Sequence, residues 1–440
     1  MKKTWLKKLI SATVIAAMGI TLLVGCTSGG NQSSSGGNNS GGDSGGNSGG
    51  DAGKEVTINF RYWADNTDYS QLMQDIIKKF NDENGKGITV VGEEAPWDGG
   101  SYSENLFNAK MGGASIDVAT WKLTSTPLFV NNKLLADLTP FLKDWADKGD
   151  IDDNIWDIMK EAGGSEDATY VMPWNIQVLY VYYRPSIFEQ AGIEVPKSYD
   201  EFLQAIEKTT MDTNGDGTTD VYGFGMRGST GGQEPWGSFV HGPGGDFKDM
   251  TTAEAVQGMQ DFMDVFTKGY APPTAPSDGF NEIIANFQSG LTAMTIHHTG
   301  SSAAMEKALG DDVSAFAFPP GKGQWTSMGD TDTVIFESCE NKEAAFEWIS
   351  YLATGEGQKM WCEGTGNVPV SKTVQQEDFF QNNRFMKASI EGQSYAGILP
   401  ILDTTSEWIS TTWPNTVAKA LLGSMTAQEC MEALQQQLYR

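Results

Sequence analysis

After residue 54, short apolar runs with a two-residue period alternate with longer stretches in which apolar residues recur every three or four positions. The first pattern predicts strands, and the second predicts helices that bury one face. The first expected elements are a strand at 56–60, a helix at 69–81, a strand at 88–91, a helix at 102–111 and a strand at 116–119. Strand, helix and strand in this order predict parallel pairing through a right-handed crossover, and therefore an α/β lobe.

A second set of elements begins near residue 178 and predicts another α/β lobe. Pro185 opens its first helix at a position where a missing N–H costs nothing. The remaining expected elements are strands at 178–183 and 333–336 and helices at 200–209, 252–268, 279–287, 301–309, 342–354, 356–362 and 426–439. The chain from 54 to 440 is long enough for two lobes with cores of their own.

The first 25 residues read as an export signal, because four lysines precede an uncharged, mostly apolar stretch that is short for a membrane span. The stretch closes on Gly25 and Cys26, which resembles the bacterial lipobox, in which the cysteine is acylated. The alternative is an ordinary cleavage site beside a chance cysteine. Residues 26–53 are rich in Gly, Ser and Asn, and predict a flexible tether behind the lipid anchor.

The chain has a formal net charge of −27. So acidic a chain disfavours nucleic acid and anionic lipid as partners and makes a neutral ligand the easier fit. Cys339, Cys362 and Cys430 have no spacing typical of a disulfide framework or a metal site. A bridge between Cys339 and Cys362 and three free, buried thiols are both compatible with the sequence.

Several segments, in order, resemble the bacterial extracellular solute-binding proteins of the maltose-binding type, which serve ATP-driven importers. They are 170–173, 188–192, 195–203, 287–290, 293–296, 318–321, 341–348, 351–357 and 366–369. The resemblance implies the two-lobe periplasmic-binding-protein fold of type II, with mixed, mostly parallel sheets flanked by helices and joined by a hinge. It implies lobes of 54–175 with 328–380 and of 176–327 with 381–440.

The same resemblance implies a non-enzymatic receptor that closes on a sugar or oligosaccharide and delivers it to permease subunits. Such a receptor is a monomer, held at the extracellular face of the cell membrane through the lipid anchor alone. The chain departs from the family pattern at Arg184, where asparagine is common, and at Ile116, where proline is common. His297 and His298 stand where the family frequently has an aromatic residue that stacks on sugar.

A sugar site needs flat aromatic faces for ring C–H groups and fixed polar groups for hydroxyls. The chain places tryptophan beside a polar residue at Trp63 with Asp65, Trp97 with Asp98, Trp174 with Asn175, and Glu234 with Trp236. The resemblance adds Trp121, Gln177 and Trp413, and His297 is a candidate for bonding to hydroxyls at the edge of the site. The alternative for each tryptophan is core packing, which the helical patterns favour for Trp145, Trp156, Trp348 and Trp361.

Residues 212–220 follow the beginning of a calcium loop, with oxygen-bearing side chains at alternate positions, although Gly223 stands where the loop's closing glutamate belongs. A structural calcium there and a metal-free turn rich in Asx and Gly are the two readings, and the second is favoured. The sequence predicts no other metal and no cofactor.

Two other functions are compatible with the composition. A secreted carbohydrate-active hydrolase would use paired carboxylates in a tryptophan-rich cleft, but the family-like segments leave no room for a catalytic domain. A receptor for a non-sugar solute, such as a polyamine, a peptide or a metal complex, would use Asp65, Asp98 and Glu234 as counter-charges and tryptophans as cation–π faces.

Overall fold

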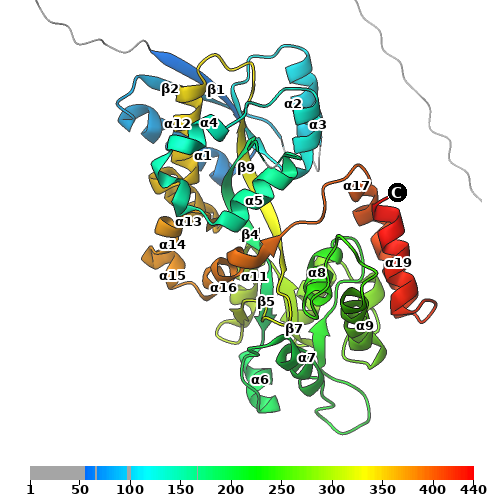
Figure 1. Ribbon diagram of the computed structural model, residues 1–440. Helices are drawn as coiled ribbons and strands as arrows, with labels where there is room; N and C mark the ends of the chain where they lie inside the picture. Colours follow the sequence, from blue (N-terminus) through cyan, green and yellow to red (C-terminus); the bar gives the residue numbers. More distant parts are fainter. Residues whose placement is uncertain (1–54, 65–66, 97–100, 166) are drawn as a thin grey trace, which may run out of the picture. The chain divides into compact units, whose positions relative to one another are not determined.

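The computed structural model describes residues 55–64, 67–96, 101–165 and 167–440, and two β-sheets organise them (Figure 1). The strands are β1 (Val56–Tyr62), β2 (Ile88–Glu94), β3 (Val118–Trp121), β4 (Val171–Val178), β5 (Tyr180–Tyr183), β6 (Tyr222–Gly225), β7 (Thr292–His297), β8 (Ser314–Phe316), β9 (Thr326–Ile335), β10 (Val368–Pro369) and β11 (Ala396–Gly397).

Helices surround both sheets. They are α1 (Thr67–Glu83), α2 (Ser101–Met111), α3 (Thr126–Asn131), α4 (Thr139–Asp144), α5 (Asp153–Ala162), α6 (Pro185–Ala191), α7 (Tyr199–Lys208), α8 (Gln233–His241), α9 (Ala253–Thr267), α10 (Phe280–Gln288), α11 (Ser302–Leu309), α12 (Lys342–Ala353), α13 (Gly355–Thr365), α14 (Lys372–Gln375), α15 (Asp378–Gln381), α16 (Arg384–Gly392), α17 (Thr405–Glu407), α18 (Trp413–Leu421) and α19 (Ala427–Leu438). Short 3-10 turns are η1 (Leu123–Ser125), η2 (Ala146–Asp150), η3 (Ala275–Ser277), η4 (Thr299–Ser301) and η5 (Gln393–Tyr395), and η6 (Trp408–Thr412) is a π-turn.

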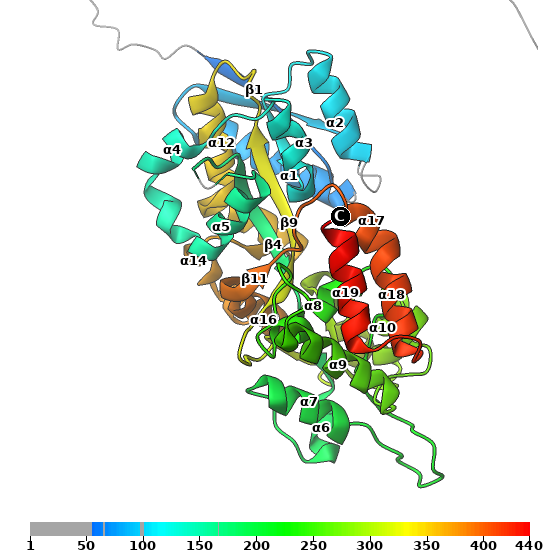
Figure 2. The same ribbon diagram turned by 45° about the vertical axis from the view of Figure 1, so that its right-hand side comes forward.

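The first sheet has the strand order β10-β4-β9-β3-β1-β2, and β11 pairs with β9. β1 runs parallel to β2 and to β3, which confirms the predicted crossover unit. In α1 the buried residues Met73, Ile76, Ile77 and Phe80 recur every three or four positions, as the apolar stripe requires. Figures 1 and 2 show α2 and α12 on opposite sides of this sheet.

The second sheet has the order β6-β7-β5-β8. Only β6 and β7 run parallel among its pairs, since β5 is antiparallel to both β7 and β8. Each lobe is therefore a mixed sheet flanked by helices, as expected, but the expected excess of parallel pairs is wrong for the second sheet. The physical reason is that β5 enters it directly from the first sheet, without a crossover helix, and so runs against its neighbours.

The apolar run at 178–183 is divided between the two sheets. β4 ends at Val178 in the first sheet and β5 begins at Tyr180 in the second, so the sequence prediction of one strand there is wrong. Both strands are buried, and a continuous apolar pattern cannot show where the chain passes from one sheet to the other. Trp325 belongs to the apolar core of the second sheet and Met328 to that of the first. The chain therefore passes between the two sheets a second time between these residues.

The C-terminal helices belong to the second core. α19 packs against α9 and α18, and Trp408, Trp413 and Val417 lie in the same apolar cluster as Phe239 and Phe262. Figure 2 shows α19 beside α18. The residue limits that the family resemblance implies for the two lobes remain a prediction.

Candidate ligand-binding site

A cavity of about 190 Å³ opens where β4 and β9 meet the loops after β1 and β3. Because β1 and β3 are parallel, their carboxyl ends lie at the same edge of the sheet, where α/β folds bind ligands. The cavity is lined by Trp63, Tyr69, Lys122, Trp174, Asn175, Gln177, Gly329, Asp330, Thr331, Trp361 and Asn367.

Aromatic rings form one side of this cavity. The ring centroids of Trp174 and Trp361 lie 4.8 Å apart, and Tyr69 meets Trp361 edge-on at 6.0 Å. Trp63 packs edge-on against Tyr102 at 4.8 Å. These flat, apolar surfaces can take the C–H faces of a ring-shaped ligand.

Polar groups in the same walls lack partners among the described residues. The indole Nε1 atoms of Trp174 and Trp361 and the amide Nδ2 of Asn175 are buried without a hydrogen bond. Gln177 Nε2 donates to Asn367 Oδ1 at 2.6 Å, and the Leu123 backbone N–H donates to Asp330 Oδ2 at 2.8 Å. Amide, lysine, threonine and aspartate side chains line the cavity beside the aromatic rings, so a ligand with several hydroxyl groups suits it.

A second polar cluster lies at the carboxyl ends of β6 and β7, which are parallel neighbours. Arg227 follows β6, and its Nη1 lies 4.0 Å from Glu234 Oε2 at the beginning of α8. The Phe280 ring meets the His297 ring edge-on at 4.4 Å, and the Arg227 Cζ lies 5.8 Å from the Phe280 centroid. His298 lies 4.4 Å from His297 between ring centroids. This cluster offers an exposed aromatic edge with donors and acceptors around it.

Both histidines in the second cluster are held neutral. Burial first, and then the charges of His298 and Arg227, lower the pKa of His297 to about 3. Burial and Arg227 lower the pKa of His298 to about 4. His297 Nδ1 lies 3.0 Å from Ser301 Oγ, while its Nε2 is buried without a partner among the described residues.

The turn η4 connects the two clusters. A Cβ added to Gly300 in η4 would lie 3.9 Å from Gln177 Oε1 of the cavity wall and 2.8 Å from the His298 ring. Gly300 therefore lies between the indole-lined cavity and the histidine pair.

The structure brings several predicted site residues together. Trp63, Trp174, Asn175 and Gln177 line one cavity, and Glu234 and His297 belong to the second cluster. Asp65, Trp97 and Asp98 lie outside the described residues, as does Cys26.

Three predicted tryptophans lie in the cores instead. Trp121, Trp236 and Trp413 are at most 1% exposed. Trp121 donates to Thr126 Oγ1 at 2.9 Å, and Trp236 packs between Phe247 and Trp413. Burial alone does not separate them from Trp174, which is also 1% exposed, but none of the three lines the cavity. Trp121 shows that a position at the end of a strand does not fix the direction of a side chain.

The sequence missed other residues of the two clusters. They are Tyr69, Lys122, Asp330, Trp361 and Asn367 in the cavity and Arg227 and Phe280 in the second cluster. Trp361 was predicted as core, and it is both 5% exposed and part of the cavity wall. Phe280 could have been noticed in the sequence, because this large aromatic residue follows Gly279 at the beginning of a helix.

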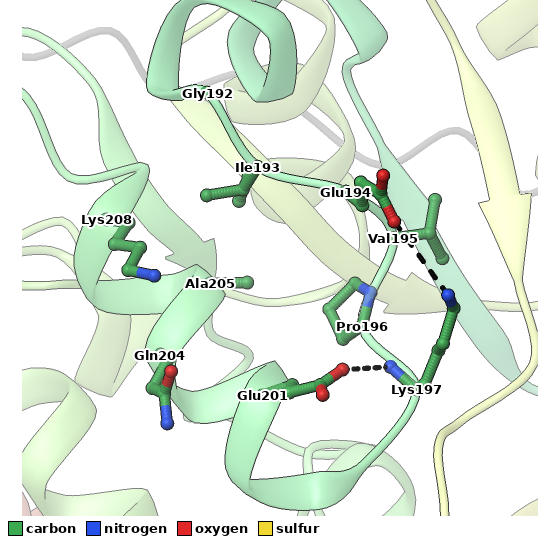
Figure 3. Close-up of a pocket in the computed structure, with 10 residues that line it drawn as sticks. All are labelled: Gly192, Ile193, Glu194, Val195, Pro196, Lys197, Glu201, Gln204, Ala205 and Lys208. Carbon is green, nitrogen blue, oxygen red and sulfur yellow. Dashed lines mark hydrogen bonds and ion pairs between the residues drawn. The ribbon is translucent and has the colours of Figure 1, made fainter.

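A larger cavity, of about 320 Å³, lies between α6 and α7 (Figure 3). Its charged groups pair among themselves, with Lys197 Nζ 3.8 Å from Glu194 Oε2 and the Lys197 backbone N–H donating to Glu201 at 2.7 Å. Lys197 and Glu194 are 80% and 91% exposed, and no aromatic ring lines the cavity. It lacks the desolvated donors and aromatic faces of the cavity at β4.

The loop at 212–220 satisfies its carboxylates internally. Asp212 accepts the backbone N–H groups of Gly215 and Gly217 at 2.7 Å each, and Asp220 accepts the Thr213 N–H at 2.8 Å. This is the hydrogen bonding of Asx turns, so the loop keeps its form through its own amides. Within the described ranges, no group of three or more acidic, His or Cys side chains is arranged to hold a metal ion.

Cys339, Cys362 and Cys430 are free and buried. The reading with three free thiols is confirmed, and the bridge between Cys339 and Cys362 is wrong. Along the described parts of the chain, no helix combines the length and apolar character needed to cross a bilayer.

Several known proteins are similar to this chain in fold and, more distantly, in sequence. A sugar-binding MalE of Xanthomonas citri aligns over 86% of this chain and 95% of its own, with 17% identity and a TM-score of 0.75. The GacH receptor of Streptomyces glaucescens, solved without ligand and with acarbose, aligns over 87% and 97%, with 20% identity and a TM-score of 0.67. A mannitol-binding protein of Pseudomonas aeruginosa is 24% identical over 323 residues, covering 66% of this chain and 72% of its own.

The family model for bacterial extracellular solute-binding proteins matches residues 63–359, a range that includes Arg227, both site histidines and all the residues that line the indole-lined cavity except Trp361 and Asn367. The chain therefore belongs to the bacterial extracellular solute-binding protein family.

Proposed function

We propose that this protein is the solute-binding receptor of an ATP-driven importer and that its solute is a sugar, a sugar alcohol or an oligosaccharide. The observation that carries the proposal is the cavity lined by Trp63, Trp174 and Trp361 together with the polar side chains of Lys122, Asn175, Gln177, Asp330, Thr331 and Asn367. Such a cavity matches the C–H faces and the hydroxyl oxygens of a carbohydrate. The relatives named for mannitol, acarbose and sugar binding support the same class.

Hinge closure would bring the second cluster onto the ligand. Arg227 and Glu234 offer adjacent donors and acceptors, and Phe280, which is 39% exposed, offers a ring face. Closure of two lobes around a ligand gives the permease a form to recognise that the empty receptor does not present. The protein is accordingly a receptor and not an enzyme.

The site charges favour a sugar over a polyamine. Lys122 lines the cavity, and Arg227 lies in the second cluster, so a cationic solute would meet a cation on each side. Arg227 pairs with Glu234, and Lys122 donates to the Asp330 backbone carbonyl while the Asp330 carboxylate also lines the cavity, so each side offers donors and acceptors to uncharged hydroxyl groups.

A thermal-shift screen tests the solute class. We expect the largest rise in Tm from a glycan in a panel of maltose, maltotetraose, mannitol, tagatose, spermidine and short peptides. A ligand at a hundred times its Kd stabilises the fold by about 2.7 kcal/mol. Calorimetric titration then gives the affinity. A clear shift with spermidine or peptide, together with none from the glycans, would overturn the sugar proposal.

We further propose that Cys26 carries the lipid anchor and that the receptor acts as a monomer at the extracellular face. The Cys26→Ser variant should move from the membrane fraction into the medium, while the parent chain stays with the membrane. Retention of the variant in the membrane fraction contradicts the anchor. Light scattering of the detergent-solubilised protein tests the monomer.

A further inference from the structure

Asp332 is a buried carboxyl group beneath the candidate cavity. It lies in β9 between β3 and β4, directly opposite Trp121 on one side and Pro173 on the other. Its side chain is 0% exposed, and neither carboxyl oxygen makes a hydrogen bond of good geometry with the described residues. A carboxyl group in such surroundings needs an explanation, because an isolated buried carboxylate is very costly.

The neighbour across the sheet explains the shape of this region. Pro173 has no N–H to give to the ladder, and the register between β4 and β9 shifts between Pro173 and Asn175. Trp174 is thus the extra residue of a β-bulge, a device that redirects a side chain beside a site. Trp174 lies between the residues that pair with Asp332 and Thr331, so its backbone is next to Asp332, and its N–H lowers the pKa of Asp332 by less than burial raises it.

The charged groups around Asp332 come from its own strand and from the loop after β3. Asp330 is two residues away on the same face of β9, and it lines the cavity. Lys122 donates to the Asp330 backbone carbonyl, and the Leu123 N–H donates to the Asp330 carboxylate. Burial first, and then the charge of Asp330, raise the pKa of Asp332 well above its usual range.

We propose that Asp332 is a positioning residue of the ligand cavity that works in its protonated form, accepting from the Trp174 backbone N–H and donating to the Asp330 carboxylate. One neutral carboxyl group then holds both the bulged indole and the carboxylate that line the cavity. A neutral carboxyl can do this because it has one donor and an acceptor, whereas a carboxylate has acceptors alone. The role in ligand affinity rests on the function proposed above, but the protonation state does not.

The proposal has a definite pH dependence. A carboxyl group whose pKa is higher in the folded than in the unfolded chain stabilises the fold fully below the unfolded pKa of about 3.9. That contribution is lost as pH rises through the folded pKa. Ionisation would also place a second negative charge beside Asp330, so both stability and affinity should fall on the alkaline side.

The variants Asp332→Asn and Asp332→Leu separate the two roles. An amide has the shape of the protonated carboxyl, accepts through Oδ1 and donates through Nδ2, but does not ionise. Asp332→Asn should therefore keep the affinity for the glycan that binds best, with maltotetraose and mannitol as first probes, to within about twofold at pH 7. It should hold that affinity to pH 9 while the parent weakens. Asp332→Leu should bind at least about tenfold more weakly at every pH.

Asp117→Asn is the matched control. Asp117 lies just before β3, far along the strand from the cavity, and accepts the Asn59 N–H at 2.9 Å. Its amide variant should lower Tm at pH 7 without changing affinity. Asp332→Asn should instead keep or raise Tm at pH 7 and reduce its decline between pH 6 and pH 9. A loss of Tm in Asp332→Asn like that in the control, or parent-like binding by Asp332→Leu, overturns the proposal.

The experiments distinguish a failure of the proposed sugar-binding function from a failure of the proposal for Asp332. If neither maltotetraose nor mannitol binds, the sugar proposal fails, while the Tm profile of the unliganded protein still decides whether Asp332 is protonated. The position of Trp174 is then measured by its fluorescence emission. This emission is obtained for the parent and for each Asp332 variant by subtracting the spectrum of the same protein carrying Trp174→Phe. Asp332→Asn should keep that emission and Asp332→Leu should shift it; identical emission in all three proteins counts against positioning.

Discussion

The indoles of Trp174 and Trp361 lie with their centroids 4.8 Å apart and their planes inclined by 34°, although one comes from a bulge in β4 and the other from α13. Gln358, one turn before Trp361, fixes this contact by donating from Nε2 to the Trp174 carbonyl oxygen at 2.7 Å. The indole wall of the cavity is thus built before a ligand arrives, and the ligand need not order it.

Reducing one aromatic ring of this wall should weaken ligand binding. We expect Trp361→Phe to raise Kd about two- to tenfold, since a well-placed aromatic contact contributes about 0.5–1.5 kcal/mol. Calorimetric titration with the glycan that gives the largest thermal shift measures the change.

Trp348→Phe is the control for that variant. Trp348 is also a buried helical tryptophan of the first core whose Nε1 has no partner among the described residues, but it does not line the cavity. Its replacement should cost similar stability and leave Kd unchanged. Equal Kd values for the two variants would show that Trp361 is a core residue only.

Phe280 should contribute to affinity and little to stability. Its ring is 39% exposed and contacts His297, so truncation to Ala leaves only a small internal gap. We expect Kd to rise about tenfold through lost stacking, with Tm within about 2 °C of the parent. Phe379→Ala, at a ring that is 44% exposed in α15, should leave Kd unchanged. An unchanged Kd in Phe280→Ala removes Phe280 from the site.

Stability should fall on mild acidification because all three histidines are held neutral. Burial lowers the pKa of His241 to about 4, His297 to about 3 and His298 to about 4, from the usual 6.5. A base with a lowered folded pKa stabilises the fold fully above pH 6.5 and loses that contribution as pH falls toward the folded value. Each histidine should lower the free energy of unfolding by about 2 kcal/mol between pH 7 and pH 5.

His241→Phe tests this directly. His241 stacks on Trp325 with 12° between the planes, and its Nε2 is buried without a partner among the described residues, so a phenyl ring suits the position. Unfolding by denaturant at pH 7 and pH 5 should show a smaller acid loss in the variant. An equal loss in both proteins means that His241 is not buried neutral.

The three described thiols should be unreactive in the folded protein. Burial raises the pKa of Cys339 to about 11 and of Cys430 to about 12, and the pKa of Cys362 well above its usual value. A thiol reagent should therefore label none of them at pH 8 until denaturant is added, since the thiolate is the reactive form. Rapid labelling of the native protein contradicts the burial of these side chains.

The α/β character of the chain and much of its element order follow from local sequence patterns. Period-two and period-3.6 patterns are local, so the crossover unit from β1 to β2 and the stripe from Met73 to Phe80 could be predicted from neighbouring residues alone. The pairing of tryptophan with a neighbouring polar residue, which is also local, selected Trp63, Trp174 and Asn175, and all three line the cavity.

Tertiary structure alone decided which tryptophans face the cavity. Trp121 ends β3 and Trp174 lies within β4, and both are buried, yet only Trp174, at the bulge after Pro173, lines the cavity. Trp361 reaches the same wall from a helix whose pattern predicts only burial. The direction of a side chain depends on which distant strand or helix lies opposite, and such long-range pairing leaves no local periodicity in the sequence.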